Sequence, residues 1–146
     1  MIVGIGVDLV DIARFERSLA RTPRLAERLF TPAEQTRAPR SLAARYAAKE
    51  ALIKALGGSD GVHWTEIEIT PDASGKPWFS LTGSTAGVVA ARGITSLHLS
   101  MSHDAGLATA YVIAEAVSDS ENRTGFGPAG AKDPNPAIVS ESEGAP

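Results

Sequence analysis

The stretch from Ser41 to Gly58, SLAARYAAKEALIKALGG, constrains the fold of this chain more than any other segment. Alanine and leucine, which favour helices, dominate its interior. Ser41 is a favourable N-cap, and Gly57 and Gly58 readily adopt the left-handed conformation that ends many helices. The sequence therefore predicts a helix of about four turns, against which the remaining elements pack.

The two faces of this predicted helix differ in character, since residues three or four apart share a face. One face carries small residues with one acid and one base: Ala43, Ala47, Glu50 and Lys54. A second stripe is larger and apolar, and we expect it to pack onto the rest of the domain: Leu42, Tyr46, Ile53 and Leu56. By themselves, Glu50 and Lys54 are also compatible with a solvated ion pair that stabilises the helix by about 0.2–0.5 kcal/mol.

Length and composition fit a single domain. The 146 residues are enough to build a hydrophobic core, and the absence of cysteine excludes disulfides and thiol nucleophiles. The first residues lack the basic segment of a signal peptide, and no apolar run approaches the length of a membrane span. We therefore expect a soluble, cytoplasmic protein without a membrane partner.

The net charge of −3 conceals an uneven distribution. Residues 1–54 hold ten of the fourteen basic residues and six of the seventeen acidic ones, whereas residues 55–118 hold two and six. A basic front half on an acidic protein predicts a localised anionic partner. It argues against general affinity for nucleic acid, which requires a broad basic patch.

Hydrophobic periodicity and turn residues predict an α+β domain over residues 1–118. The expected order is strand, three helices, two strands, one helix and two strands, over 2–9, 11–30, 31–38, 41–58, 64–70, 76–81, 84–92, 96–102 and 107–115. Thr22-Pro23 is expected to break the first helix in two, and Pro39 to stop the second. Residues 119–146 are rich in Gly, Pro, Ser and acids, so we expect a disordered or loosely tethered tail.

Several residues near the N-terminus have more than one interpretation. Gly4 and Gly6 in the first strand indicate close approach of another backbone. Asp8 closes this apolar strand, where a carboxylate needs a partner such as a metal, although Asp8 or Asp11 is also a good helix cap. Five arginines align on one helical face: Arg14, Arg17, Arg21, Arg24 and Arg28. That stripe is either a solvated surface or a docking face for an acidic helix or for phosphates.

The candidate chemistry lies in Asp8, Glu50, Lys54 and His103. Two carboxylates without a histidine cluster favour a hard cation such as Mg²⁺, which binds one or two carboxylates together with water and substrate phosphates. Lys54, one turn beyond Glu50, would neutralise phosphate charge beside that metal. His103 would move a proton or bind a phosphate, although a lone histidine is often structural. The sequence thus predicts a Mg²⁺ site for a phosphate-bearing substrate.

Five segments, in the right order, resemble the holo-acyl-carrier-protein synthases, which are the small phosphopantetheinyl transferases. They lie within residues 2–115 and comprise GIGVDLVDIARFE, FTPAE, RYAAKEALIKALG, GKPWFSL and LSMSHDAGLATAYVIAE. The first segment and the helix are highly specific together, whereas GKP or SHD alone is weak. The resemblance implies a phosphopantetheinyl transferase-like α+β fold, with a small antiparallel sheet packed against the long central helix.

The resemblance also implies the reaction and the residues that perform it. Such an enzyme transfers the 4′-phosphopantetheine of coenzyme A to a serine of apo acyl carrier protein, releases adenosine 3′,5′-bisphosphate and supports fatty acid biosynthesis. The matched positions take the following roles: Asp8 and Glu50 bind Mg²⁺; Lys54, Glu50 and His103 are catalytic; Arg45, Lys49, Lys76 and His103 contact coenzyme A; Arg14 and Arg21 dock the acidic carrier. The family pattern further implies a homotrimer with active sites at subunit interfaces. The base that removes the serine proton stays open between a metal-bound water, Glu50 and Asp104.

Two other functions fit parts of the same pattern. A non-catalytic module that binds coenzyme A or carrier protein would keep Arg14 and the basic helix, but it would not need Asp8, Glu50 and Lys54 together. A Mg²⁺-dependent phosphohydrolase would activate water and would need no acidic protein partner.

Overall fold

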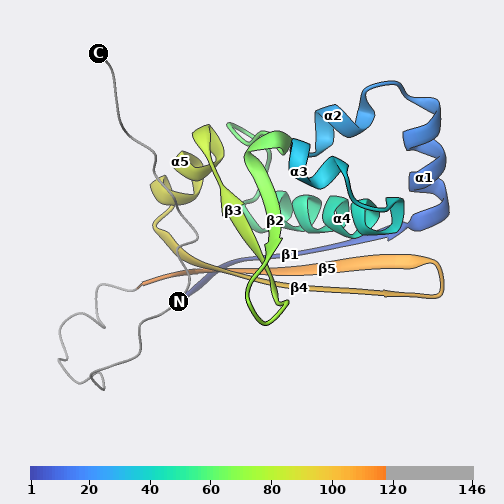
Figure 1. The fold of residues 1–146 in the computed structure, drawn as a ribbon. Coiled ribbons are helices and arrows are strands. Elements are labelled where there is room, and N and C mark those ends of the chain that lie inside the picture. The colour runs from blue at the N-terminus through green and yellow to red at the C-terminus, as the bar shows by residue number, and fades with distance from the viewer. Residues whose placement is uncertain (118–146) are drawn as a thin grey trace, which may run out of the picture.

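The computed structural model describes residues 1–117, which form the α+β architecture expected from the sequence (Figure 1). In chain order the elements are β1 (Ile2–Asp11), α1 (Ile12–Arg21), α2 (Leu25–Leu29), α3 (Pro32–Gln35), α4 (Pro39–Ala55), the 3₁₀ turn η1 (Trp64–Glu66), β2 (Ile67–Pro71), β3 (Pro77–Leu81), α5 (Gly83–Ala91), β4 (Ile94–Asp104) and β5 (Leu107–Ala116). The predicted tail, residues 119–146, lies outside the described residues. Within residues 1–117, every helix is too short or too polar to span a bilayer.

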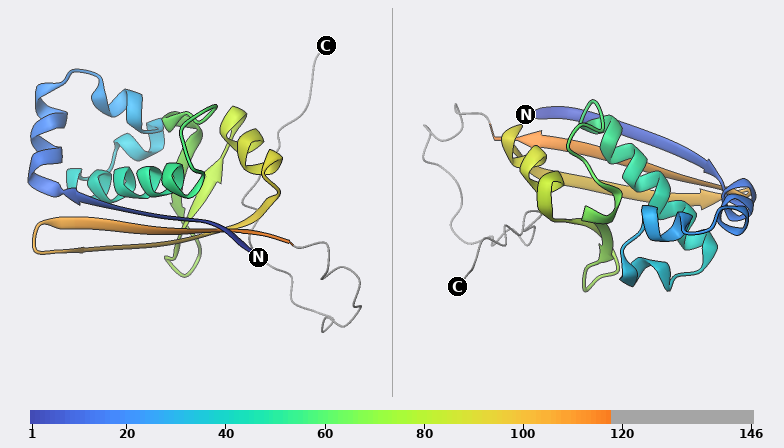
Figure 2. Two further views of the ribbon diagram at one scale, coloured as in Figure 1. Left: turned by 180° about the vertical axis from the view of Figure 1, so that it is seen from behind. Right: turned by 90° about the horizontal axis from the view of Figure 1, so that it is seen from above.

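Two antiparallel sheets flank the long helix α4. The larger sheet has the strand order β1-β5-β4, and the smaller pairs β2 with β3. Seen from the side and from above, α4 lies across one face of the larger sheet (Figures 1 and 2). Asp8 of β1 stands opposite Ala110 of β5 in this sheet. The fold thus brings the N-terminal strand beside the central helix, although the two are far apart in the sequence.

Glycines in β1 let α4 approach the sheet closely, as the sequence predicts. A Cβ added at Gly4 would lie 2.1 Å from the carbonyl oxygen of Ala55, and one at Gly6 would lie 1.8 Å from that of Ala51. Small side chains of α4 and β5 are fully buried in the same core: Ala43, Ala47, Ala48, Ala51, Ala108, Ala110 and Ala114. Helix and strand are therefore held almost backbone to backbone, which fixes the side chains that they carry.

α4 begins earlier than predicted and is buried on more sides. Pro39 stands in its first turn and Ala38 is the N-cap, so the prediction of Ser41 as N-cap was wrong. The fixed φ of proline suits the start of a helix, and Pro39 therefore begins α4 in addition to ending the segment before it. The larger apolar stripe is not the only packing face, because Ala43 and Ala47 are fully buried. Gly57, at a φ of +73°, follows the end of the helix as predicted.

The structure gives Asp8 and Asp11 different positions at the N-terminus. β1 runs through Asp11, so Asp8 lies within the strand and not at its end. Strand alternation places Asp8 on the same face as Gly4 and Gly6, the face that packs on α4. Asp11 is the N-cap of α1, and its carboxylate accepts a hydrogen bond of 2.8 Å from the backbone N–H of Arg14. Asp11 therefore caps a helix, whereas Asp8 is available for another role.

The other face of the larger sheet is open and apolar. Its exposed large side chains alternate along the strands with buried residues. They are Val3, Ile5, Val7, Leu9 and Tyr111. A contiguous exposed apolar surface of this kind is typical of an interaction site.

Candidate active site

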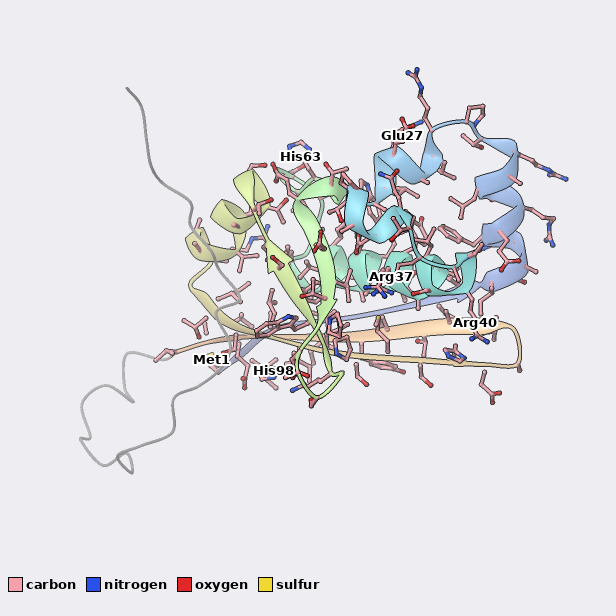
Figure 3. All side chains as sticks on the ribbon, viewed as in Figure 1. Met1, Glu27, Arg37, Arg40, His63 and His98 are labelled. Atoms are coloured by element: carbon pink, nitrogen blue, oxygen red, sulfur yellow. The ribbon has the colours of Figure 1, made fainter. Side chains whose placement is uncertain are left out.

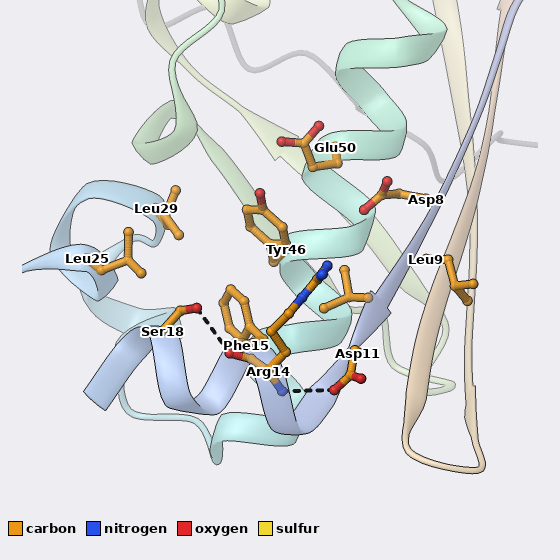
Figure 4. A pocket seen from close by; sticks show the side chains of 11 residues that line it. Asp8, Leu9, Asp11, Arg14, Phe15, Ser18, Leu25, Leu29, Tyr46 and Glu50 are labelled. Carbon is orange, nitrogen blue, oxygen red and sulfur yellow. Dashed lines mark hydrogen bonds between the residues drawn. The ribbon is translucent and has the colours of Figure 1, made fainter. Parts of the chain in front are cut away.

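A hollow of about 530 Å³, here called the first pocket, opens between β1, α1, α2 and α4 (Figure 4). Asp8 of β1 and Glu50 of α4 lie at one end, and the side chain of Arg14 extends toward them from α1. The walls are largely apolar and include Phe15, Leu25, Leu29 and Tyr46. The first pocket therefore combines a charged end with an apolar wall. It brings together Asp8, Arg14 and Glu50, three of the residues that the sequence predicts as functional.

Lys54 lies beside Asp8. Its Nζ donates hydrogen bonds to Oδ1 of Asp8 at 2.7 Å and to the carbonyl oxygen of Val7 at 3.0 Å. About half of the Lys54 side chain is exposed (51%), whereas that of Asp8 is largely covered (15%). Because half of the Lys54 side chain is exposed, its ammonium group can turn from Asp8 toward an incoming phosphate.

The carboxyl group of Glu50 is poorly solvated. Burial raises its pKa above the ordinary value, and the negative charge of Asp8 raises it further. The neighbouring Tyr46 hydroxyl and the positive charge of Lys54 oppose that rise in the pKa. Glu50 and Asp8 therefore repel each other when both are ionised.

The two carboxylates fit a Mg²⁺ site in charge and in donor type. A cation between Asp8 and Glu50 would relieve the repulsion that raises the pKa of Glu50. Mg²⁺ binds through one or two carboxylates and takes its remaining oxygen ligands from water and substrate phosphates. Within residues 1–117, no group of three His, Asp or Glu side chains is placed to hold a metal. A cation held by Asp8 and Glu50 would take its other oxygen ligands from water and from substrate phosphates.

Aromatic stacking fixes the wall of the first pocket, a feature that the sequence analysis missed. The ring of Tyr46 stacks on Phe15 at a centroid distance of 5.0 Å and on Trp64 at 5.4 Å. Phe15 in turn meets Phe30 edge to face at 6.2 Å. The stack joins α1, α4 and η1, so it holds Tyr46 beside Glu50. Three aromatic residues scattered over fifty positions give no periodic signal that would have revealed it.

A second pocket of about 410 Å³ holds other predicted residues. Arg45 of α4 and His103 of β4 line it together, and Gly75 and Pro77, the neighbours of Lys76, form another part of its wall. Lys76 itself is exposed. Arg40, which the sequence analysis did not single out, also lines this pocket and lies near the start of α4 (Figure 3). The predicted coenzyme A contacts Arg45 and His103 are thus brought together, but in a different pocket from Asp8 and Glu50.

Lys49 is misplaced in the predicted set of coenzyme A contacts. Its side chain is fully buried, and its Nζ donates three hydrogen bonds, to Glu34 Oε2 at 2.7 Å, to the carbonyl oxygen of Leu29 at 2.8 Å and to that of Trp64 at 3.0 Å. All of its donors are therefore used inside the core. The prediction for Lys49 is wrong because adjacency to Glu50 along a helix points the two side chains in different directions.

The predicted docking arginines lie on the outside of α1. Arg14 and Arg21 are both exposed, and Arg14 also reaches the first pocket. Asp104 lies at the turn between β4 and β5, where its Oδ1 accepts a hydrogen bond from the N–H of Ala105 at 2.8 Å. Two residues were considered as the base that removes the serine proton. Glu50 lines the first pocket, whereas Asp104 lines another hollow together with His103.

Comparisons with known proteins agree with this geometry. Residues 4–114 match a family model described as the 4′-phosphopantetheinyl transferase superfamily. A holo-[acyl-carrier-protein] synthase of Clavibacter sepedonicus is 64% identical over 115 residues, which is 79% of this chain and 97% of the relative. The crystal structure of a holo-[acyl-carrier-protein] synthase from Neisseria meningitidis has a TM-score of 0.72 and 37% identity, covering 79% of this chain and 99% of that one. An ACPS–CoA complex from Chronobacterium ammoniagenes has a TM-score of 0.67 and 36% identity, covering 79% and 98%.

Proposed function

The chain belongs to the 4′-phosphopantetheinyl transferase superfamily, as a holo-[acyl-carrier-protein] synthase, and we propose that Asp8, Glu50 and Lys54 form its catalytic centre. The enzyme transfers the 4′-phosphopantetheine group of coenzyme A to acyl carrier protein. One observation carries the assignment of the centre: Asp8 and Glu50 lie at the charged end of the first pocket, where β1 packs on α4, and the Lys54 ammonium group pairs with Asp8. Transfer of a phosphoryl group mainly requires charge neutralisation and positioning, which this arrangement supplies.

The reaction assigns a task to each residue. The carrier's serine oxygen bonds to a phosphorus of coenzyme A, and the bond from that phosphorus to the bridging pyrophosphate oxygen breaks. Adenosine 3′,5′-bisphosphate leaves with charge on that oxygen, and Lys54 donates a hydrogen bond or a proton to it. Mg²⁺ held by Asp8 and Glu50 would neutralise charge on the pyrophosphate. Of the two carboxylates weighed as the base, Glu50 lines the first pocket and Asp104 does not, which favours Glu50 as the acceptor of the serine proton.

Replacement of Lys54 by alanine should slow transfer by about a hundredfold at saturating substrate, because charge on the leaving oxygen loses its donor. Coenzyme A should bind with nearly unchanged affinity, since about half of the Lys54 side chain is exposed and its ammonium group is already paired with Asp8. Single-turnover rates and calorimetric titration with coenzyme A measure the two effects separately. Lys54→Arg, which retains the charge, is the matched control and should recover part of the rate. An effect on coenzyme A binding alone would move Lys54 from catalysis to recognition.

We propose that each active site needs two copies of the chain. Asp8 and Glu50 line the first pocket, whereas Arg45 and His103 line the second, so one chain holds the catalytic centre and the proposed coenzyme A contacts apart. A neighbouring copy packed on the open apolar face of β1 and β5 would bury Ile5, Leu9 and Tyr111. Both features support the homotrimer with interfacial sites that the family resemblance implies.

Arg14 and Arg21 are proposed to dock the acidic carrier protein. Arg21→Glu should raise the KM for the carrier by about tenfold and weaken its salt dependence, because Arg21 is exposed outside the first pocket and a rim charge steers association. The KM for coenzyme A should stay the same. Arg92→Glu makes the same change of charge at the exposed C-cap of α5 and serves as the control. Equal effects of the two substitutions would contradict a docking role for α1. A phosphohydrolase acting on nucleotides would respond to neither.

The non-catalytic binding module is the weaker alternative. It would have no use for an acidic pair that repels itself, and the curated relative at 64% identity is a synthase. The cytoplasmic location and the division into a transferase domain, residues 1–118, and a tail, residues 119–146, stay predictions from the sequence.

A further inference from the structure

We propose that Lys49 is a positioning residue that fixes α2 as the carrier-facing wall of the first pocket. The inference rests on the proposed function, because it takes α1 as the side on which the carrier protein docks, and α2 follows α1 in the chain and lines the same pocket. Lys49 would then act through α2 and not by touching either substrate.

The contacts of Lys49 connect the elements around the pocket. Its Nζ lies 2.8 Å from the carbonyl oxygen of Leu29, the last residue of α2, and 3.0 Å from that of Trp64 in η1. It pairs with Glu34 of α3 at 2.7 Å and lies 5.0 Å from the centre of the Phe30 ring. One ammonium group on α4 thus holds α2, α3 and η1.

Glu34 extends the connection to the smaller sheet. Its Oε1 accepts a hydrogen bond from the N–H of Ile69 in β2 at 2.9 Å, and its Oε2 accepts one from the N–H of Thr31 at 3.1 Å. Both Lys49 and Glu34 are almost completely covered, at 0% and 2% exposure. Burial lowers the pKa of Lys49, and the contact with Glu34 opposes that change.

α2 needs such an external support. It has five residues, all at least partly exposed, and a helix this short has little stability of its own. The last carbonyl groups of a helix have no partner within it, and Lys49 supplies one to Leu29. Leu25 and Leu29 of α2 line one side of the first pocket (Figure 4). Loss of the ammonium group would therefore loosen this wall, whereas the glycine–alanine contact would still hold α4 against β1.

The test is a double variant, Lys49→Met with Glu34→Gln. Removing one partner alone leaves a buried, unpaired charge, which destabilises a fold strongly, whereas replacing both with neutral groups of similar size is tolerated far better. We expect the KM for the carrier protein to rise about tenfold or more in the double variant, because small misplacements of positioning elements have large kinetic effects. The KM for coenzyme A should change less than the KM for the carrier, because Arg45, which lies 3.9 Å from Glu34 and loses that negative charge, keeps its hydrogen bonds with Ser41 and Ile69.

Glu66→Gln is the matched control. Glu66 also accepts several hydrogen bonds, from Ser84 Oγ and from the N–H and Oγ1 of Thr85, but at the start of α5. It should lower the melting temperature without changing the KM for the carrier. If Lys49 were only structural, the double variant would behave in the same way: the apparent kcat would fall with the folded fraction and both KM values would stay constant, which overturns the inference.

Two further results decide the remaining cases. If the double variant does not fold, Lys49→Arg takes its place, because it keeps the positive charge. We then expect a smaller rise in the KM for the carrier, again without an equal rise in the KM for coenzyme A. Equal changes in both KM values, or none, would overturn the inference. Failure of the wild-type protein to modify any carrier would overturn the proposed function and the inference with it, and it is seen before any variant is compared.

Discussion

Replacing Glu50 with glutamine should reduce the rate of phosphopantetheine transfer by about a thousandfold at saturating coenzyme A and carrier protein. Glutamine has the size of glutamate but no charge, so it weakens a metal site without leaving a cavity. Of the two carboxylates proposed to hold Mg²⁺, only that of Asp8 would then remain. Rates measured over a range of Mg²⁺ concentrations test this, and the variant should need far more Mg²⁺ for half-maximal activity. An unchanged rate at limiting Mg²⁺ would contradict the metal assignment.

The same variant should be more stable than the wild type in the absence of metal. Because the pKa of Glu50 is raised in the folded protein, ionisation of Glu50 costs stability as the pH rises through that value. Below the ordinary glutamate pKa of about 4.3 the carboxyl group is neutral in both states and the cost disappears. Glu50→Gln should therefore melt above the wild type at pH 7, and the difference should shrink toward pH 4. An inactive variant that melts below the wild type would indicate damage to the fold instead.

Gly6→Ala should destabilise the protein by about 3 kcal/mol or more, at the upper end of overpacking effects. The new Cβ would lie 1.8 Å from the carbonyl oxygen of Ala51 and 2.8 Å from the backbone nitrogen of Ala55. Backbone atoms of a buried helix have no rotamer by which to avoid that contact, so α4 must move away from β1. Urea unfolding followed by circular dichroism, at fixed protein concentration, gives the change in free energy.

Gly87→Ala is the matched control for this prediction. Gly87 lies in α5, and apart from its two neighbours and the backbone of its own helix a Cβ there meets no atom of the described residues within 4 Å. Alanine should therefore stabilise the protein by up to about 1 kcal/mol through its higher helix propensity. A Gly6→Ala variant as stable as the wild type would show that α4 and β1 do not pack backbone to backbone, and the placement of Glu50 beside Asp8 would lose its basis.

Local patterns in the sequence were enough to predict most of the elements, and they singled out Asp8, Glu50 and Lys54, which the structure brings close together. Alanine-rich helix, alternating strands and turn residues each leave a short-range signal, and the motifs carry the family resemblance that the comparisons confirm. The ends of the helices were harder to predict, because Pro39 is compatible both with ending one helix and with starting the next.

Features that depend on long-range contacts could not be predicted. The core role of Lys49 comes from carbonyl groups of Leu29 and Trp64 and from Glu34, none of which is marked in the sequence as its partner. The division of Glu50 and His103 between two pockets depends on where the turn between β4 and β5 lies relative to α4. Periodicity assigns a residue to a face, but the structure alone shows what that face meets.

Mass spectrometry of an intact carrier protein tests the central claim most directly. Apo acyl carrier protein is incubated with this enzyme, coenzyme A and Mg²⁺, beside a chelator-treated sample and one with the Glu50→Gln variant. We predict a gain of one phosphopantetheine group on the carrier's serine in the complete mixture, with little or none in the other two. An unmodified carrier in the complete mixture, or equal modification in all three, would contradict a transferase centre built on Asp8, Glu50 and Lys54.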